Sequence, residues 1–153
     1  MERRFEYPAK IERDEAGFFL LTFPDFPEAA TDGRSREEAL AEAADCLEEA
    51  VAGRIKRGED IPLPSRTPGD MVQIALPTLH TMKAALYLAL REANLSPADL
   101  ATRLGKDQKE IRRLLDPRHA SRPEALEAAL QAVGKRVQVI IANTGSASFS
   151  CME

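Results

Sequence analysis

The sequence predicts an α+β protein in which a small sheet packed on one helix is followed by an all-helical unit that ends in a strand. Three observations predict this: alternating apolar residues near the start, helical spacing of apolar residues further on, and a proline-rich break between the two patterns. The 153 residues suffice for one ordinary domain or two small ones. We therefore expect domains at residues 1–77 and 78–143, with a disordered tail at 144–153.

Four segments of the first half have the patterns of strands. Arg3 to Arg13 alternates apolar and charged residues, which predicts a half-buried strand. Phe18 to Phe23 is apolar nearly throughout, which predicts a central strand that Pro24 to Pro27 ends, because proline cannot donate to a ladder. Glu28 to Thr31 is expected to form a short third strand, and Met71 to Leu76 predicts another.

One helix is predicted between these strands. Ser35 to Glu38 has the pattern of a capping box, which predicts the start of a helix that runs to about Arg57 and ends at Gly58. The proline-rich segment Glu59 to Gly69 cannot continue it. Apolar residues at three- and four-residue spacing are expected to pack on the sheet. They are Leu40, Ala43, Leu47, Ala50, Val51 and Ile55.

Residues 96–115, SPADLATRLGKDQKEIRRLL, have the spacing of a DNA-reading helix-turn-helix. Ala101 is small where two steeply crossing helices approach, and Gly105 can adopt the positive φ that starts the turn. Ser96 and Asp107 have the positions of N-caps. The inner faces of both helices are expected to bury Leu100, Leu104, Ile111, Leu114 and Leu115. An ordinary helical hairpin is the alternative interpretation.

The elements around this motif predict a dimer. Thr78 to Ala93 precedes the motif as a strong helix, and a further helix, capped at Ser121, is expected through Val133. Arg136 to Asn143 is β-branched and alternating, but a lone strand is not stable. Pairing with the same strand of a second chain would satisfy both edges and give a homodimer, or a tetramer if the N-terminal domains also pair.

Basic side chains are expected to line the outer face of the second helix of the motif. Gln108 has the geometry to pair with adenine, and Lys109 or Arg112 to donate to guanine. The termini at Ser96 and Ser121 can offer backbone amides to phosphates. Phosphate contacts are further expected from Arg113, Arg118 and Arg122. A solvated basic face is the alternative.

The charge is divided between the two halves of the chain. The formal net charge is −4, with 10 Lys/Arg and 17 Asp/Glu in residues 1–76 and 11 Lys/Arg and 8 Asp/Glu in residues 77–153. The halves therefore carry −7 and +3, which predicts two partners of opposite charge.

The sequence does not predict an enzyme, a cofactor or a metal. A two-metal nuclease needs converging carboxylates. The candidate carboxylates instead have turn-like surroundings: Asp14, Glu15, Asp25, Glu28 and Asp32. The histidines His80 and His119 do not stand at metal-ligand spacing from Cys46 or Cys151. No run of about 18 apolar residues and no signal peptide occur, so we expect a cytoplasmic protein without a membrane span.

The order of elements resembles the HicB antitoxin family of HicAB toxin-antitoxin systems. The resemblance rests on the hairpin FFLLTFPDFPEAATDG and the following helix SREEALAEAADCLEEAV, and it covers about residues 3–76. Residues 78–134 are similar to the Cro/repressor type of helix-turn-helix domain, which one branch of the family carries. Other branches carry a ribbon-helix-helix instead.

The resemblance implies an antitoxin with two partners. The N-terminal domain, similar to a truncated ribonuclease H fold, would bind and block a small basic HicA-type ribonuclease toxin by occluding its RNA site. The C-terminal domain would repress its own operon by binding operator DNA. We expect toxin contacts at Phe23, Asp25, Phe26 and Glu28 and on the acidic face of the helix. The alternatives are a ligand-sensing repressor and a ribonuclease H-like nuclease.

Overall fold

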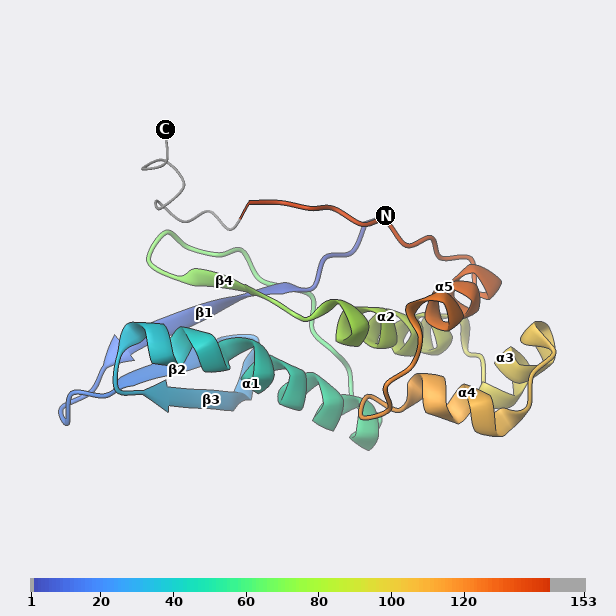
Figure 1. Cartoon of the computed structure of the whole chain (residues 1–153), viewed down its shortest axis with the longest axis horizontal. Coiled ribbons are helices and arrows are strands. Elements are labelled where there is room, and N and C mark those ends of the chain that lie inside the picture. Colours follow the sequence, from blue (N-terminus) through green and yellow to red (C-terminus); the bar gives the residue numbers. More distant parts are fainter. Residues whose placement is uncertain (1, 144–153) are drawn as a thin grey trace.

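The computed structural model describes residues 2–143 and has the mixed α+β architecture that the sequence predicts: a four-stranded sheet, a long helix on it and four shorter helices (Figure 1). In chain order the elements are β1 (Glu6–Arg13), β2 (Phe19–Phe23), β3 (Phe26–Gly33), α1 (Arg36–Arg57), β4 (Val72–Ala75), α2 (Thr78–Ala93), α3 (Pro97–Leu104), α4 (Gln108–Leu115) and α5 (Pro123–Ala132).

The sheet is antiparallel throughout, in the order β3-β2-β1-β4. The predicted central position of β2 is confirmed. The predicted break from Pro24 to Pro27 was too long, because Phe26 already pairs with Phe23 across a tight turn and β3 begins there. Pro27 is tolerated inside β3 because β3 is an edge strand, where one side needs no ladder donor.

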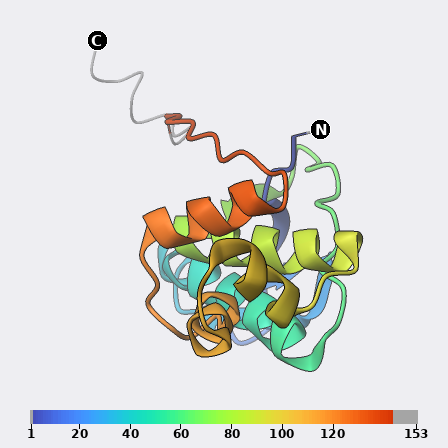
Figure 2. The ribbon, with the colours of Figure 1, turned by 90° about the vertical axis from the view of Figure 1, so that its right-hand side faces the viewer.

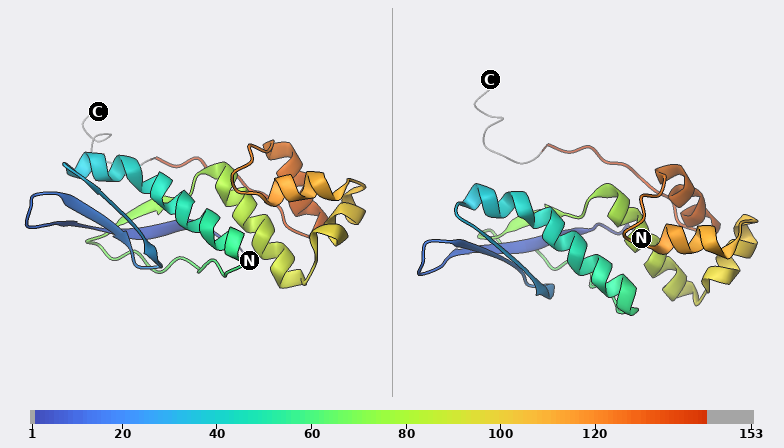
Figure 3. Two further views of the ribbon diagram at one scale, coloured as in Figure 1. Left: turned by 90° about the horizontal axis from the view of Figure 1, so that it is seen from below. Right: turned by 60° about the horizontal axis from the view of Figure 1, so that its bottom comes forward.

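Helix α1 covers one face of this sheet (Figure 3). Its start is confirmed: the Ser35 hydroxyl oxygen accepts from the Glu38 amide at 3.1 Å, and Gly58 ends the helix with φ 71°. Gly33 is required at the entry to α1, because a Cβ there would lie 2.6 Å from the Ala39 nitrogen. The buried face differs slightly from the prediction, since the small residues Ala39 and Ala52 are buried while Leu40 and Ile55 are only partly buried.

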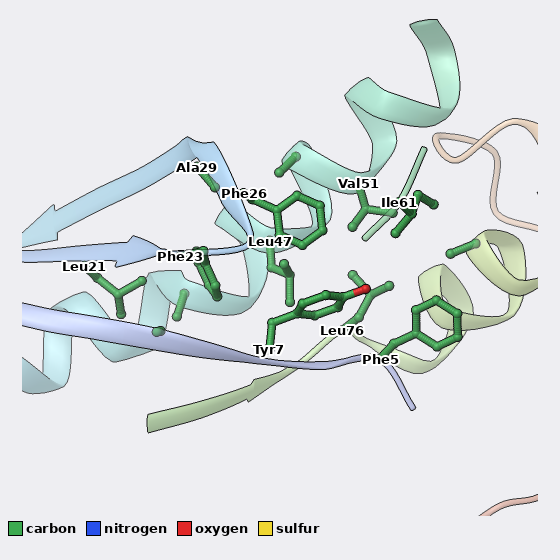
Figure 4. Packing of buried hydrophobic residues seen from close by; sticks show 14 of the residues in the cluster. Phe5, Tyr7, Leu21, Phe23, Phe26, Ala29, Leu47, Val51, Ile61 and Leu76 are labelled. Carbon is green, nitrogen blue, oxygen red and sulfur yellow. The ribbon is translucent and has the colours of Figure 1, made fainter. Parts of the chain in front are cut away.

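The hydrophobic cluster that contains the core between the sheet and α1 has four buried aromatic rings, those of Phe5, Tyr7, Phe23 and Phe26 (Figure 4). Tyr7 meets Phe26 edge to face with 4.9 Å between ring centroids, and Leu47 lies between this pair and Phe23. The Tyr7 hydroxyl donates to the Pro62 carbonyl at 2.8 Å, and burial raises the pKa of Tyr7 to about 12. Ile61 is also buried, so the proline-rich segment seals one end of the core.

Helix α2 belongs to two hydrophobic clusters. Ala84 and Leu88 pack into the cluster between the sheet and α1, whereas Met82, Leu86 and Leu90 pack against α3, α4 and α5. The residues of the two clusters therefore lie on two sides of α2, which makes this helix the link between the two halves of the chain.

Helices α3 and α4 are joined by a three-residue turn and lie against α2 and α5 (Figure 2). The capping box at Ser96 and Asp99 is present, Gly105 adopts φ 64°, and the Asp107 carboxylate caps α4. The inner face is as predicted for Leu100, Ile111 and Leu114, which are buried, whereas Leu104 and Leu115 are partly buried.

Residues 135–143 follow α5 as an extended segment that leads away from the helices (Figures 1 and 2). The strand predicted at Arg136 to Asn143 is not formed by this single chain, and Val139, Ile140 and Ile141 are 75%, 64% and 91% exposed. The tail predicted to be disordered, residues 144–153, lies outside the described residues. Among residues 2–143, no helix is long and apolar enough to cross a membrane.

Candidate nucleic-acid and protein interfaces

The outer face of α4 presents four polar side chains to solvent. The Asp107 Oδ1 accepts from the Glu110 amide at 2.9 Å and defines where the helix starts. Ile111 and Leu114 lie on the opposite face of α4 and are buried against the other helices. Within the described part of the chain, the four predicted DNA contacts on this face form no ion pair and no side-chain hydrogen bond, and all are exposed. They are Gln108, Lys109, Arg112 and Arg113.

The loop between α4 and α5 carries the other two predicted contacts, Arg118 and Arg122. Arg118 Nη2 lies 3.1 Å from Glu49 Oε2 on α1, in an ion pair whose side chains are both more than half exposed. Exposed pairs of this kind contribute about 0–1 kcal/mol, so a phosphate can compete for the guanidinium. Arg122 is exposed and stands at the N-cap position of α5.

Ser121 does not cap α5, which corrects the sequence-based expectation. The N-cap residue is Arg122, and no side chain caps the helix. The Ser121 hydroxyl instead donates to the Arg113 carbonyl at 3.3 Å and accepts from Lys83 at 2.9 Å. Ser121 therefore joins the loop to the end of α4.

Lys83 is a structural residue that the sequence reasoning missed. It is 1% exposed in the middle of α2, although lysine is seldom fully buried. Burial lowers the pKa of its ammonium group, and the negative charge of Asp116 only partly offsets this lowering. One signal was available: Lys83 is the single cation inside the otherwise uncharged run TLHTMKAALYLAL, at a position that faces the α4 side of α2.

The four residues predicted to contact a toxin take part in internal structure. Phe23 and Phe26 are 1% and 0% exposed and point into the core (Figure 4). The Asp25 carboxylate accepts from the amide and the hydroxyl of Ser65. Glu28 accepts two hydrogen bonds from Arg54, at 2.6 and 2.9 Å.

Arg54 connects this set of residues. Its guanidinium lies over the Phe26 ring at 4.9 Å, and its hydrogen bonds hold the pKa of Glu28 below the usual value for glutamate. The aromatic residues of the FPDFP stretch thus fold the hairpin, and the two carboxylates anchor α1 and the proline-rich segment to it. Only exposed atoms of this region are accessible to a partner.

An acidic groove runs between the edge strand β3 and α1. It has a volume of about 410 Å³ and extends along the acidic face that the sequence predicted for α1. Its ionisable side chains are four carboxylates, one thiol and one guanidinium: Glu28, Glu42, Asp45, Glu49, Cys46 and Arg57. Glu42 and Asp45 have no cation within ion-pair distance among residues 2–143, so their charges are available to a basic surface.

No group of three or more His, Cys, Asp or Glu side chains among the described residues is placed to hold a metal ion. His80 lies 3.3 Å from Glu48 across the contact between α1 and α2, rather than beside a second ligand. The predicted carboxylate candidates for a nuclease centre are dispersed over turns, the hairpin and β3.

Comparisons with known proteins identify the family of the chain. A family model described as the HicB-like antitoxin of bacterial toxin-antitoxin systems matches residues 6–85, from β1 into α2. Antitoxin HicB 2 of Photorhabdus laumondii is 36% identical over 140 residues, which cover 92% of this chain and 99% of that relative. Antitoxin HicB of Escherichia coli K12 is 32% identical over 88% of this chain and 98% of its own length.

A further relative, antitoxin HicB of Pseudomonas fluorescens Pf0-1, is 35% identical over 87% of this chain and 91% of that protein. These relatives are named as antitoxins rather than enzymes, in agreement with the non-enzymatic role that the sequence predicts. The family match spans more than half of the chain, and the relatives align with it from the sheet to the C-terminal helices. The chain therefore belongs to the HicB family of antitoxins.

Proposed function

We propose that this antitoxin performs two tasks: its sheet and α1 bind and block a small, basic HicA-type ribonuclease toxin, and its α3–α4 pair binds operator DNA to repress its own operon. The observation that carries the second task is the exposed polar face of α4, held outward by buried Ile111 and Leu114. This proposal places the protein in the cytoplasm, together with operator DNA and the RNA that a toxin would cleave.

The α3–α4 pair is proposed to act as a helix-turn-helix of the Cro/repressor type. In such motifs the N-terminal part of the second helix reads base edges in the major groove. Gln108 and Lys109 occupy the first turn of α4, and Arg112 lies one turn further on the same face. Bidentate contacts by such side chains discriminate between bases, whereas Arg113, Arg118 and Arg122 would contact phosphates.

A two-fold dimer is proposed to bring two α4 helices to one operator. The exposed segment Arg136 to Asn143 has unpaired backbone groups and three large exposed aliphatic side chains. Pairing of this segment with its copy in a second chain would satisfy one edge of each strand and bury aliphatic side chains between the chains. Two half-sites on one face of DNA lie about 34–36 Å apart, a spacing that a common strand pair would set.

The acidic groove between β3 and α1 is proposed as the toxin surface. Residues 1–76 carry a net charge of −7, and a protein that binds RNA is expected to present a basic surface. Glu42 and Asp45 offer unpaired carboxylates there, whereas Phe23, Asp25, Phe26 and Glu28 would act by shaping the hairpin beneath. Covering the basic RNA site of the toxin would block it sterically.

The two alternatives make different demands on the structure. A ligand-sensing repressor would need a site such as the groove of about 1250 Å³ between the end of α1, α2 and the α4–α5 loop. Two arginines of that groove are already engaged, Arg91 with Asp60 and Arg3 with Glu92. A nuclease would need a metal centre. The groove alone does not identify a ligand, and both alternatives are outcomes of the test.

A crossed pair of variants tests both tasks in the full-length protein. Changing Gln108, Lys109 and Arg112 together to Ala should abolish binding to the DNA upstream of the gene and leave capture of the neighbouring gene's product intact. Glu42→Gln with Asp45→Asn should weaken capture and leave DNA binding intact. Retained DNA binding by the triple variant would refute the role of α4. If a small molecule releases the DNA without any protein partner, the ligand-sensing repressor is favoured. If the protein cleaves nucleic acid in a metal-dependent reaction that Asp25→Asn abolishes, the nuclease is favoured.

A further inference from the structure

A buried ammonium group holds the end of α4 and the loop that follows it. Lys83 Nζ lies within hydrogen-bond distance of the carbonyl oxygens of Arg113, Leu114 and Asp116, at 3.0, 3.1 and 2.8 Å, and of the Ser121 hydroxyl oxygen at 2.9 Å, so its three N–H groups are shared among four acceptors. All four acceptors lie about 30 or more residues away in the chain. The contact is therefore a tertiary one, made between α2 and the segment from Arg113 to Ser121.

The end of α4 differs from the ends of the helices before it. Helices α1, α2 and α3 end at Gly58, Asn94 and Gly105, each in the left-handed conformation that lets following amides bond the last carbonyls. Helix α4 ends at Asp116 with φ −78° and ψ 112°, and its cap amide makes one bond, to the Arg113 carbonyl, where the caps of the other three make two. Lys83 adds a donor to the carbonyls of Arg113, Leu114 and Asp116, and it places a positive charge at the negative end of the helix dipole.

This support matters because α4 has only eight residues. An isolated helix of that length is not stable in water, so its placement depends on packing and on its ends. Two of the carbonyls that Lys83 binds belong to α4 itself, and one of them belongs to Arg113 on the exposed face. The other two acceptors belong to the loop that carries Arg118.

We propose that Lys83 is a positioning residue for DNA recognition: its buried ammonium group fixes the reading helix α4 and the phosphate-contact loop as one unit against α2. This proposal rests on the proposed function, in which α4 reads the operator. Lys83 touches no DNA. It acts because a displacement of α4 by about 1 Å is sufficient to misalign bidentate contacts to bases.

A positioning role should affect the affinity for operator DNA more than the affinity for DNA of random sequence. Loss of Lys83 should reduce operator affinity by about tenfold or more, because the Leu114 carbonyl would lose its donor and the end of α4 its tie to α2, which favours a shifted α4. Affinity for random-sequence DNA of equal length should change much less, since phosphate contacts tolerate displacement. A residue that only stabilised the whole fold would lower both affinities together.

The test uses the full-length protein, its own upstream DNA and Lys83→Met, which keeps the length of the side chain but removes its donors. Lys135→Met is the matched control, because Lys135 is an exposed cation of the same half whose one ion pair within residues 2–143 is with Glu92. Hydrogen exchange should increase in the last turn of α4 and in residues 116–121 of Lys83→Met, and not in α1 or the sheet. Toxin capture should be unchanged.

Ser121→Ala provides a second variant that keeps the lysine and removes one acceptor. It should lower the ratio of operator to random-DNA affinity in the same direction by a smaller factor, and the two changes should be non-additive in a double-mutant cycle. If Lys83→Met does not fold, Ser121→Ala decides alone. An unchanged affinity ratio in a folded variant would overturn the positioning role. Failure of the wild-type protein to bind its upstream DNA would instead overturn the proposed function.

Discussion

The hairpin of β2 and β3 and the helix α4 are both short segments with charged and apolar residues in close alternation, yet their side chains have opposite environments. In the hairpin, Phe23 and Phe26 are buried and Glu28 is held by Arg54. In α4, Ile111 and Leu114 are buried while Gln108, Lys109 and Arg112 are exposed and form no ion pair with the described residues. The hairpin residues therefore stabilise the fold, whereas the polar residues of α4 are exposed where a partner could contact them.

The largest effect expected from this comparison is on stability. Phe26→Ala removes a ring that packs on Tyr7 and lies under Arg54, and should lower the free energy of unfolding by about 3–5 kcal/mol. Gln108→Ala, at an exposed position, should change it by less than about 0.5 kcal/mol. Urea denaturation of the two variants measures both values. Equal stabilities would show that the hairpin aromatics are not essential to the core.

The next effect is on operator binding and leaves stability unchanged. Gln108→Ala and Arg112→Ala should each weaken operator binding by about 1–3 kcal/mol, because each removes a contact to a base edge. Arg118→Ala should weaken all DNA to a similar extent and reduce the salt dependence, as expected of a phosphate contact. Fluorescence anisotropy at several salt concentrations separates the two classes. If Arg112→Ala weakened binding to operator and random DNA equally, Arg112 would be assigned to a contact with the DNA phosphate backbone instead of a base.

A smaller effect is expected at the extended C-terminal segment. Val139→Pro removes an amide from the proposed strand pair between two chains, which should cost about 1 kcal/mol and raise the dimer dissociation constant several-fold. Val139→Thr keeps the amide and serves as the control. Sedimentation of the full-length protein over a range of concentrations measures the shift. Indistinguishable association by wild type and Val139→Pro would place the dimer contact elsewhere.

The smallest effect concerns the ion pair that ties β3 to α1. Because Arg54 lowers the pKa of Glu28 in the folded state, the pair stabilises the protein above the usual pKa of glutamate and loses this contribution as the pH falls through the lowered value. Glu28→Gln should therefore cost about 0.2–1 kcal/mol at neutral pH, for a partly exposed pair, and progressively less below about pH 4. A difference in stability that does not depend on pH would indicate that packing, not charge, is lost.

The helical elements were predictable because their signals are local. Helix α1 begins after the N-cap Ser35 and ends at Gly58. Helix α3 begins after Ser96 and ends at Gly105, and α4 begins after Asp107, as caps and a positive-φ turn require. The hairpin was predicted less well, since a proline normally ends a strand and only the edge position of β3 permits Pro27 within it. Ser121 was misread for a related reason: a serine before a helix has several possible partners, and the nearby Lys83 determines which it takes.

The candidate sites divide in the same way. The outward face of α4 follows from the helical period of its own eight residues, so all four of its predicted contacts are exposed. Whether the predicted toxin contacts are accessible depends on which face of the sheet each hairpin side chain occupies and on which residues pack against that face. Arg54 and Ser65, the partners of Glu28 and Asp25, come from separate parts of the chain.

By itself the sequence determined the α+β class, the limits of α1, α2 and α3, the family, and which residues of α4 face solvent, because caps, turns and hydrophobic period act over a few residues. Tertiary structure alone decided that α2 contributes Ala84 and Leu88 to one cluster and Leu86 to the other, across the boundary predicted at residue 77. It also decided that Lys83 is buried. A lysine can leave water only where several oxygens converge on its ammonium group, and here those oxygens come from residues 113–121, which only the packing of α2 against α4 brings within reach.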